Sequence, residues 1–285
     1  MTKKILVVGG TGMLGRPVAT KLKEAGYSVS VLTRDPGKAE KKIGNNFEFL
    51  EGDVRSPSSL RKIVRGFDGV HINLNSGSFT DLDEIEVKGT ANVAKTASEA
   101  RIKKISMISG LGVMEKNAWS PMVRAKLDAE KALKMSGLAY TIFNCTHFME
   151  SIPLYIRNQK AVIIGKQEHP VHWLAADDYA EMVVQSYEKS QSDFKKVPVL
   201  GPEPIPMEEA FKTYAEYQAE DIVVTRMSPK ILSLIATITF NRDLKYVLSQ
   251  MKYFDKTPEA FTRDDIPGYL PKPSTTLKEW LAKSK

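Results

Sequence analysis

The feature that most constrains this chain is a glycine-rich turn near its beginning, in the segment KKILVVGGTGMLG (residues 3–15). The apolar, β-branched run before the turn predicts a strand buried on both faces, and the pattern after it predicts a helix. Gly9 permits a tight turn, Gly12 lets the backbone approach a phosphate, and Gly15 lets the helix pack closely on the strand. The turn therefore predicts a dinucleotide site, with a purely structural turn as the alternative.

Composition narrows the class of protein. The net charge is +7, from 41 basic and 34 acidic residues that are scattered along the chain, which predicts a solvated basic surface and no nucleic-acid partner. Cys145 is the single cysteine, which predicts a reducing compartment. The sequence has no signal-peptide pattern and no apolar run of roughly 20 residues, the length that spans a bilayer. We therefore expect a cytoplasmic protein without a membrane span.

Strand and helix patterns alternate six times in the first half of the chain, with short links between them. This alternation predicts a Rossmann-type α/β fold, in which a doubly wound parallel sheet is connected by right-handed crossovers. The expected strands are Ile5–Val8, Ser28–Thr33, Phe47–Leu50, Gly69–Leu74, Ile105–Ser109 and Leu138–Phe143.

The alternation fades beyond about residue 150. We expect residues 1–150 to form an NAD(P)-binding Rossmann domain, and residues 151–285 to form a smaller C-terminal substrate lobe interleaved with it. Residues 229–257 are predicted to be helical, and the apolar run over 229–240 is expected to pack in the core or as a pocket lid. Contact with a membrane surface is the alternative for that run, although it lacks a sustained cationic face.

Several segments together resemble the NmrA-like, atypical branch of the short-chain dehydrogenase/reductase superfamily. The matching segments are GGTGMLGRPVATKL, VLTRDPGKA, EGDV, GTANVAKTASEARIKKISMISG, AKLDAEKALKMSGLAYTIF, ADDYAE, GPEPIPMEEA and TLKEWL. They cover nearly the whole chain. The resemblance is specific for the superfamily and much less specific for a substrate.

The end of the second expected strand bears on the choice of cofactor. Enzymes that prefer NAD usually carry an acidic residue there, whereas this chain carries Arg34, whose planar guanidinium suits the 2′-phosphate of NADP. Asp35, followed by proline, is expected to shape the turn, and the alternative for Arg34 is a surface arginine. NADP is therefore expected in preference to NAD. The cofactor-binding residues expected are Gly9, Thr11, Gly12, Met13 and Leu14 for the pyrophosphate, Arg34, Asp53 and Val54 for the adenosine end, and Lys126 for the ribose.

The resemblance to the superfamily leaves the adenine position with two interpretations. It implies that Asp53 lies by the adenine amino group. Capping of the following helix is the alternative role for this carboxylate.

The catalytic positions depart from the superfamily pattern. Classical members use a serine, a tyrosine that donates the proton, and a lysine four residues after the tyrosine. Ser109 and Lys126 match the serine and the lysine, but the tyrosine position holds Met122, which cannot donate a proton. The expected catalytic residues are therefore Lys126 and Ser109 only.

Three explanations stay open. Lys126 is itself the acid, as in the isoflavone-reductase-like relatives, or it only holds the cofactor ribose. Alternatively, the protein binds NADP(H) without turnover, as a redox sensor that contacts another protein. In the third explanation the proton donor is Tyr155, His147 or His172.

The loop after the sixth strand, His147, Phe148 and Met149, is expected to line a substrate pocket near the nicotinamide. No metal site is predicted, because the histidines lack a matching set of ligands. The favoured function is NADPH-dependent reduction of a small apolar carbonyl or quinone-like compound. The alternatives are the NADP(H) sensor and a sugar-nucleotide epimerase, and the absence of a fixed charged cluster for such a substrate disfavours the epimerase.

Overall fold

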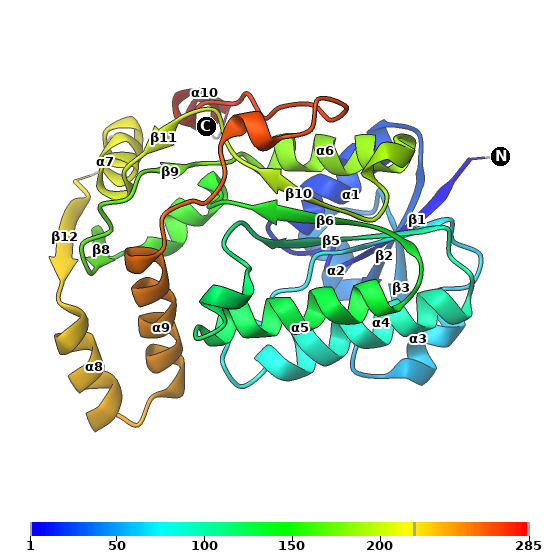
Figure 1. The fold of residues 1–285 in the computed structure, drawn as a ribbon, viewed down its shortest axis with the longest axis horizontal. Helices are drawn as coiled ribbons and strands as arrows, with labels where there is room; N and C mark the ends of the chain where they lie inside the picture. The colour runs from blue at the N-terminus through cyan, green and yellow to red at the C-terminus, as the bar shows by residue number, and fades with distance from the viewer. Residues whose placement is uncertain (1, 219–220, 284–285) are drawn as a thin grey trace.

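The computed structural model describes residues 2–218 and 221–283. Within them, seven parallel strands form a central sheet in the order β10-β6-β5-β4-β1-β2-β3 (Figure 1). Its strands are β1 (Lys4–Val8), β2 (Ser28–Thr33), β3 (Glu48–Glu51), β4 (Gly69–Ile72), β5 (Lys104–Gly110), β6 (Ala139–Cys145) and β10 (Lys195–Val199). The strand order reverses on either side of β1, which confirms the predicted Rossmann-type doubly wound fold.

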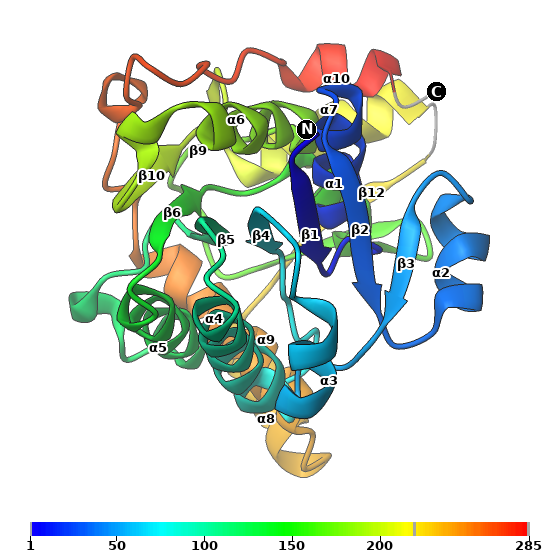
Figure 2. The same ribbon diagram turned by 90° about the vertical axis from the view of Figure 1, so that its right-hand side faces the viewer.

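Helices cover both faces of this sheet (Figure 2). On β1, Ile5 and Val7 point into the apolar cluster under one layer of helices, whereas Leu6 and Val8 point into the cluster under the other. The strand is therefore buried on both faces, as its continuous apolar run predicts. One layer consists of α1 (Gly15–Glu24) and α6 (Ala176–Glu188), and the other of α3 (Pro57–Ile63), α4 (Gly89–Glu99) and α5 (Pro121–Met135).

A smaller lobe lies at one end of the molecule, at the left of Figure 1. Its core contains Trp173 and Phe211, both fully buried. Its strands are β7 (Ile156–Arg157), β8 (Lys160–Ile164) and β12 (Val223–Met227), which pair in one sheet, and β9 (Val171–His172) and β11 (Pro204–Ile205), which pair in another. Its helices are α7 (Met207–Gln218), α8 (Pro229–Ile238), α9 (Arg242–Lys256) and α10 (Leu277–Lys283).

The second half of the chain also contributes to the central sheet. Strand β10 pairs with β6 at the edge, and α6 shares an apolar cluster with α1. The division of the chain near residue 150 stays a prediction. None of the described helices is both long and apolar enough to cross a bilayer.

The stretch 229–257 is helical, as predicted, and is divided into two helices, because α8 ends before Asn241, whose side chain caps α9 by accepting the backbone N–H of Leu244. The prediction that the apolar run over 229–240 packs in the core is wrong: only Leu232 and Ala236 of α8 are buried. Helix α2 (Pro36–Ile43) and strand β12 are not among the elements expected from the sequence.

Candidate cofactor and substrate site

The predicted site residues follow successive strands at one edge of the central sheet. The glycine turn follows β1, Arg34 follows β2, Asp53 follows β3, Ser109 lies near the end of β5, and His147 follows β6. Because the strands are parallel, their carboxyl ends share one edge, and the strand order reverses between β1 and β4. Open α/β sheets bind their ligands at such a point.

The glycine turn fits a pyrophosphate group. Gly9 has a φ of +80°, and a Cβ there would lie 2.3 Å from the carbonyl oxygen of Asn73. A Cβ on Gly15 would lie 2.2 Å from the Gly9 carbonyl oxygen, so α1 begins directly against the turn. Gly12 borders more open space, with the Gly9 carbonyl oxygen at 3.2 Å from its Cβ position. No side chain caps α1. Within its first turn the N–H of Arg16 already donates to the carbonyl oxygen of Gly12 at 3.0 Å, and Pro17 has no N–H, so phosphate oxygens would be bound by the remaining backbone N–H groups of the turn and of Gly15.

The residues expected at the adenosine end lie at the ends of β2 and β3. Arg34 is exposed, and among the described residues it forms no ion pair. Asp35 caps α2 by accepting the backbone N–H of Lys38 at 2.9 Å, so it begins a helix where the sequence predicted only a turn. The acidic residue that NAD enzymes place here is thus replaced by a free guanidinium.

Asp53 binds Arg55 rather than a helix terminus. The guanidinium of Arg55 donates to both carboxylate oxygens, and this pairing lowers the pKa of Asp53. Helix α3 is capped by Ser56, so the alternative that Asp53 is a helix cap is wrong. Val54, next to Asp53, is buried in the core cluster under α3 and α4.

A cavity of about 310 Å³ lies between this edge of the sheet and α9. Its lining is mainly apolar, and six residues predicted for the site belong to it: Met13, Leu14, Ser109, Lys126, His147 and Phe148. Met149 does not line it, because that side chain is buried in the core of the smaller lobe. The glycine turn and the expected substrate loop therefore meet in one cavity.

Lys126 is held at the wall of this cavity by two acceptors. Its Nζ lies 2.7 Å from Oε2 of Glu86 and donates to the carbonyl oxygen of Leu74 at 3.1 Å. Glu86, on the π-helical segment Leu82–Lys88, is almost completely buried, and its other oxygen accepts the backbone N–H of Ser76 at 3.1 Å. An ammonium has three N–H donors, and the hydrogen bond to the Leu74 carbonyl uses one of them, so others remain for ligands in the cavity.

The hydroxyl proton of Ser109 is engaged with Glu130 and is not directed into the cavity. The hydroxyl donates to Oε1 of Glu130 at 2.7 Å, and Glu130 in turn pairs with Lys196 on β10 at 2.7 Å. Because the hydroxyl has one proton, Ser109 can accept a hydrogen bond from a ligand but cannot donate to it in this arrangement.

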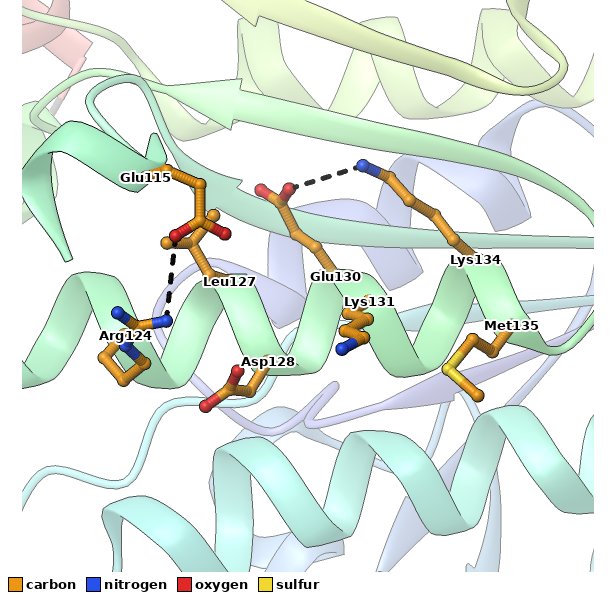
Figure 3. A pocket seen from close by; sticks show the side chains of 8 residues that line it. All are labelled: Glu115, Arg124, Leu127, Asp128, Glu130, Lys131, Lys134 and Met135. Atoms are coloured by element: carbon orange, nitrogen blue, oxygen red, sulfur yellow. Dashed lines mark ion pairs between the residues drawn. The ribbon is translucent and has the colours of Figure 1, made fainter.

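A second cavity of about 400 Å³ lies along α5 (Figure 3). Its charges are largely paired with each other, with Arg124 3.7 Å from Glu115 and Lys134 3.9 Å from Glu130. Glu130 is the residue through which this cavity is linked to Ser109. The cavity brings together none of the residues expected to bind the cofactor.

The three alternative proton donors occupy different places. His147 lines the main cavity against Phe254, with ring centroids 4.4 Å apart, and burial lowers its pKa to about 4. The Nδ1 atom of His172 lies at hydrogen-bond distance, 2.6 Å, from Oε2 of Glu259, and Glu259 is itself a lining residue. Tyr155 packs on Phe211 in the smaller lobe and is not in the lining.

Two tyrosines of α9, which the sequence did not single out as candidate proton donors, also lie at this cavity. Tyr246 and Tyr253 both line the cavity, and Tyr246 packs with Met122 in a small apolar cluster. Burial raises the pKa of each phenol to about 12. A helical pattern with aromatic residues is equally typical of core packing, so the sequence offered no signal that separated these two from other tyrosines.

The comparisons with known proteins agree with this geometry. Residues 9–189 match the model of a protein family described as NAD(P)H-binding. The chain belongs to this family. The match confirms the cofactor class that the glycine turn and the resemblance predicted.

Several relatives cover much of the chain. The chain is 29% identical over 204 residues to an NAD(P)H azoreductase of Xenophilus azovorans, covering 70% of this chain and 68% of the relative. It is 25% identical over 293 residues to the photosystem II assembly factor Ycf39 of Synechocystis, covering 98% and 89%. The structure of an NADPH-dependent quinone oxidoreductase of Escherichia coli with NADPH superposes with a TM-score of 0.76 at 18% identity, covering 98% and 99%, and supports the fold.

Proposed function

We propose that this protein is an NADPH-dependent reductase of small apolar compounds with a carbonyl, quinone-like or azo group. The observation that carries the proposal is the cavity that joins Met13 and Leu14 of the glycine turn to the buried Lys126–Glu86 ion pair. Its volume of about 310 Å³ is within the usual range for small ligands. The names of the azoreductase and quinone oxidoreductase relatives support the substrate class.

The cofactor residues follow from the placement of the strand ends. Gly9, Thr11, Gly12, Met13 and Leu14 would hold the pyrophosphate, Asp53 and Val54 the adenine, Arg34 the 2′-phosphate, and Lys126 the ribose. When bound, NADPH supplies a hydride. Lys126 would use one of its remaining N–H groups for the ribose and another to orient the acceptor and deliver the proton that balances the reduction, and Ser109 would accept a hydrogen bond nearby.

The proposed compartment is the cytoplasm, and the proposed partner is a small-molecule substrate rather than a nucleic acid. Cys145 is buried, and burial raises its thiol pKa, which keeps it in the unreactive protonated form. This suits a structural cysteine in a reducing compartment.

The test of the activity is NADPH oxidation, followed by absorbance, over a panel of quinones, azo dyes and aldehydes. We expect turnover with at least one quinone or azo compound and weaker turnover with polar aldehydes, because the cavity lining is mainly apolar. Firm NADPH binding without turnover across the panel would instead favour a non-catalytic NADP(H) sensor. That second candidate is supported by Met122 at the tyrosine position and by the engagement of the Ser109 proton with Glu130.

A substitution at Arg34 tests the cofactor preference. Arg34→Ala is expected to weaken NADPH binding by roughly 10- to 100-fold, because a charge-assisted contact to the 2′-phosphate is lost, and to leave NADH binding nearly unchanged. Isothermal titration calorimetry with both cofactors measures this directly. Lys38→Ala, which removes an exposed cation from the first turn of α2, is the matched control. An equal loss for both cofactors would contradict the assignment of Arg34 to the 2′-phosphate.

A further inference from the structure

Helix α8 presents an apolar face to solvent. The exposed apolar residues are Ile231, Leu234, Ile235, Ile238 and, just past the helix, Phe240, with exposed fractions between 40% and 86%. The four in the helix are spaced three and four residues apart, so they form one stripe along it. Leu232 and Ala236 are buried instead, which fixes the opposite stripe against the protein. Such a contiguous exposed apolar face is typical of a contact surface.

The helix carries this face on a projecting part of the molecule. The hairpin of α8 and α9 extends away from the central sheet, at the lower left of Figure 1 and at the bottom of Figure 2. Flat or bulky surfaces therefore have access to it without contacting the rest of the fold.

Two hydroxyls at the C-terminal end of α8 are hydrogen-bonded to carbonyl groups of the same helix. The hydroxyl of Thr237 donates to the carbonyl oxygen of Ser233, and that of Thr239 donates to the carbonyl oxygen of Ile235, both at 2.8 Å. Burying an unpaired hydroxyl in an apolar medium is unfavourable, and these internal bonds remove that penalty. The outer face of α8 can therefore enter a medium poor in water.

The charges of the hairpin are predominantly positive. Among the described residues, its exposed cations have no ion-pair partner; they are Lys230, Arg242, Lys245, Lys252 and Lys256. Its two acids are engaged with backbone groups instead: Asp243 accepts the N–H of Phe79, and Asp255 accepts those of Lys166 and Gln167. Because the five cations outnumber the two acids, the hairpin carries a net positive charge, and an apolar face beside that charge is complementary to a surface that is apolar beneath and anionic above.

We propose that the outer face of α8, with Phe240, docks the protein on the surface of an anionic lipid bilayer. The apolar stripe lies in the headgroup boundary, and the cations contact lipid phosphates. A second copy of this chain is a poor occupant, because a two-fold contact through α8 would bring together two hairpins that both carry a net positive charge. Docking is separate from the proposed reductase activity and does not depend on it.

Vesicle sedimentation tests the proposal with the full-length protein. Native protein is mixed with vesicles of phosphatidylcholine alone or with vesicles of phosphatidylcholine that also contain anionic phosphatidylglycerol. We expect binding to the anionic vesicles that weakens severalfold as salt is raised, because the Debye length shortens. The triple variant Leu234→Gln/Ile238→Gln/Phe240→Ser is expected to bind at least tenfold more weakly.

The matched control is Met135→Gln/Leu154→Gln, which removes two exposed apolar side chains elsewhere on the surface and should leave vesicle binding unchanged. Circular dichroism and NADPH binding of the triple variant should match those of the native protein. The proposal is overturned if native protein ignores anionic vesicles or if the triple variant binds them equally well. It is also overturned if light scattering shows a native dimer that the triple variant loses, since α8 would then be a contact between copies.

Discussion

Replacement of Lys126 by methionine is expected to destabilise the fold by about 3 kcal/mol and to lower turnover by roughly 100-fold or more. Lys126 lies 2.7 Å from Glu86, whose side chain is 3% exposed, so removing the ammonium leaves a buried carboxylate without its counter-charge. The rate falls for a separate reason, because the cavity loses the group proposed to hold the ribose and supply the proton. Urea denaturation measures the stability, and NADPH oxidation measures the rate.

A second variant distinguishes the two effects. Glu86→Gln/Lys126→Met removes both charges, so it should regain more than half of the stability lost in Lys126→Met, whereas the rate should stay low. Lys131→Met, an exposed lysine on the same helix, controls for the loss of a positive charge. If the double variant recovered its rate together with its stability, Lys126 would have a structural role only.

Acidification from pH 7 to pH 5 is expected to lower the free energy of unfolding by about 2 kcal/mol for each of His71 and His147. Burial lowers the pKa of His71 to about 3 and that of His147 to about 4, from an ordinary value of 6.5. The unfolded chain therefore binds protons below about pH 6.5 that the folded chain does not bind. The stability is complete above that pH and is lost progressively as the pH falls towards 4.

Burial keeps His71 neutral in the folded state, and both of its ring nitrogens face uncharged hydroxyl groups. Its Nδ1 lies 2.8 Å from the hydroxyl of Ser106, and its Nε2 lies 3.1 Å from the hydroxyl of Tyr179, all within the core. Urea denaturation at several pH values measures the slope, and His71→Asn should reduce the change between pH 7 and pH 5 by about half. An unaltered slope in that variant would show that His71 does not contribute to the acid sensitivity.

The parts of the fold that could be predicted are those specified by neighbours in sequence. The β-branched run before Gly9 and the spacing of the glycines specify the strand, the turn and the start of the helix, because all the residues involved are close together in sequence. Arg34 and Lys126 were found through matching segments of a family. The start of α2 could also be predicted, because an aspartate followed by proline, as at Asp35, is typical of a helix N-terminus as well as of a turn.

The missing parts depend on contacts between distant segments. Glu86 precedes its partner Lys126 by 40 positions, and Tyr246 comes from a helix in the other half of the chain, so no local spacing connects them with the cavity. The exposure of the apolar stripe of α8 could not be predicted for a different reason. Helical periodicity identifies an apolar face, but it carries no information on whether that face contacts the protein or solvent.

The place of β10 has a consequence for synthesis of the chain. Until residues 195–199 have been made, β6 is the edge strand of the sheet, and the backbone groups that later pair with β10 are open to strands of other molecules. The contact between Ser109, Glu130 and Lys196 cannot form earlier either, because Lys196 is part of β10. A nascent chain that already contains the whole glycine turn thus still lacks the last strand of the sheet and the residue that pairs with Glu130 behind Ser109.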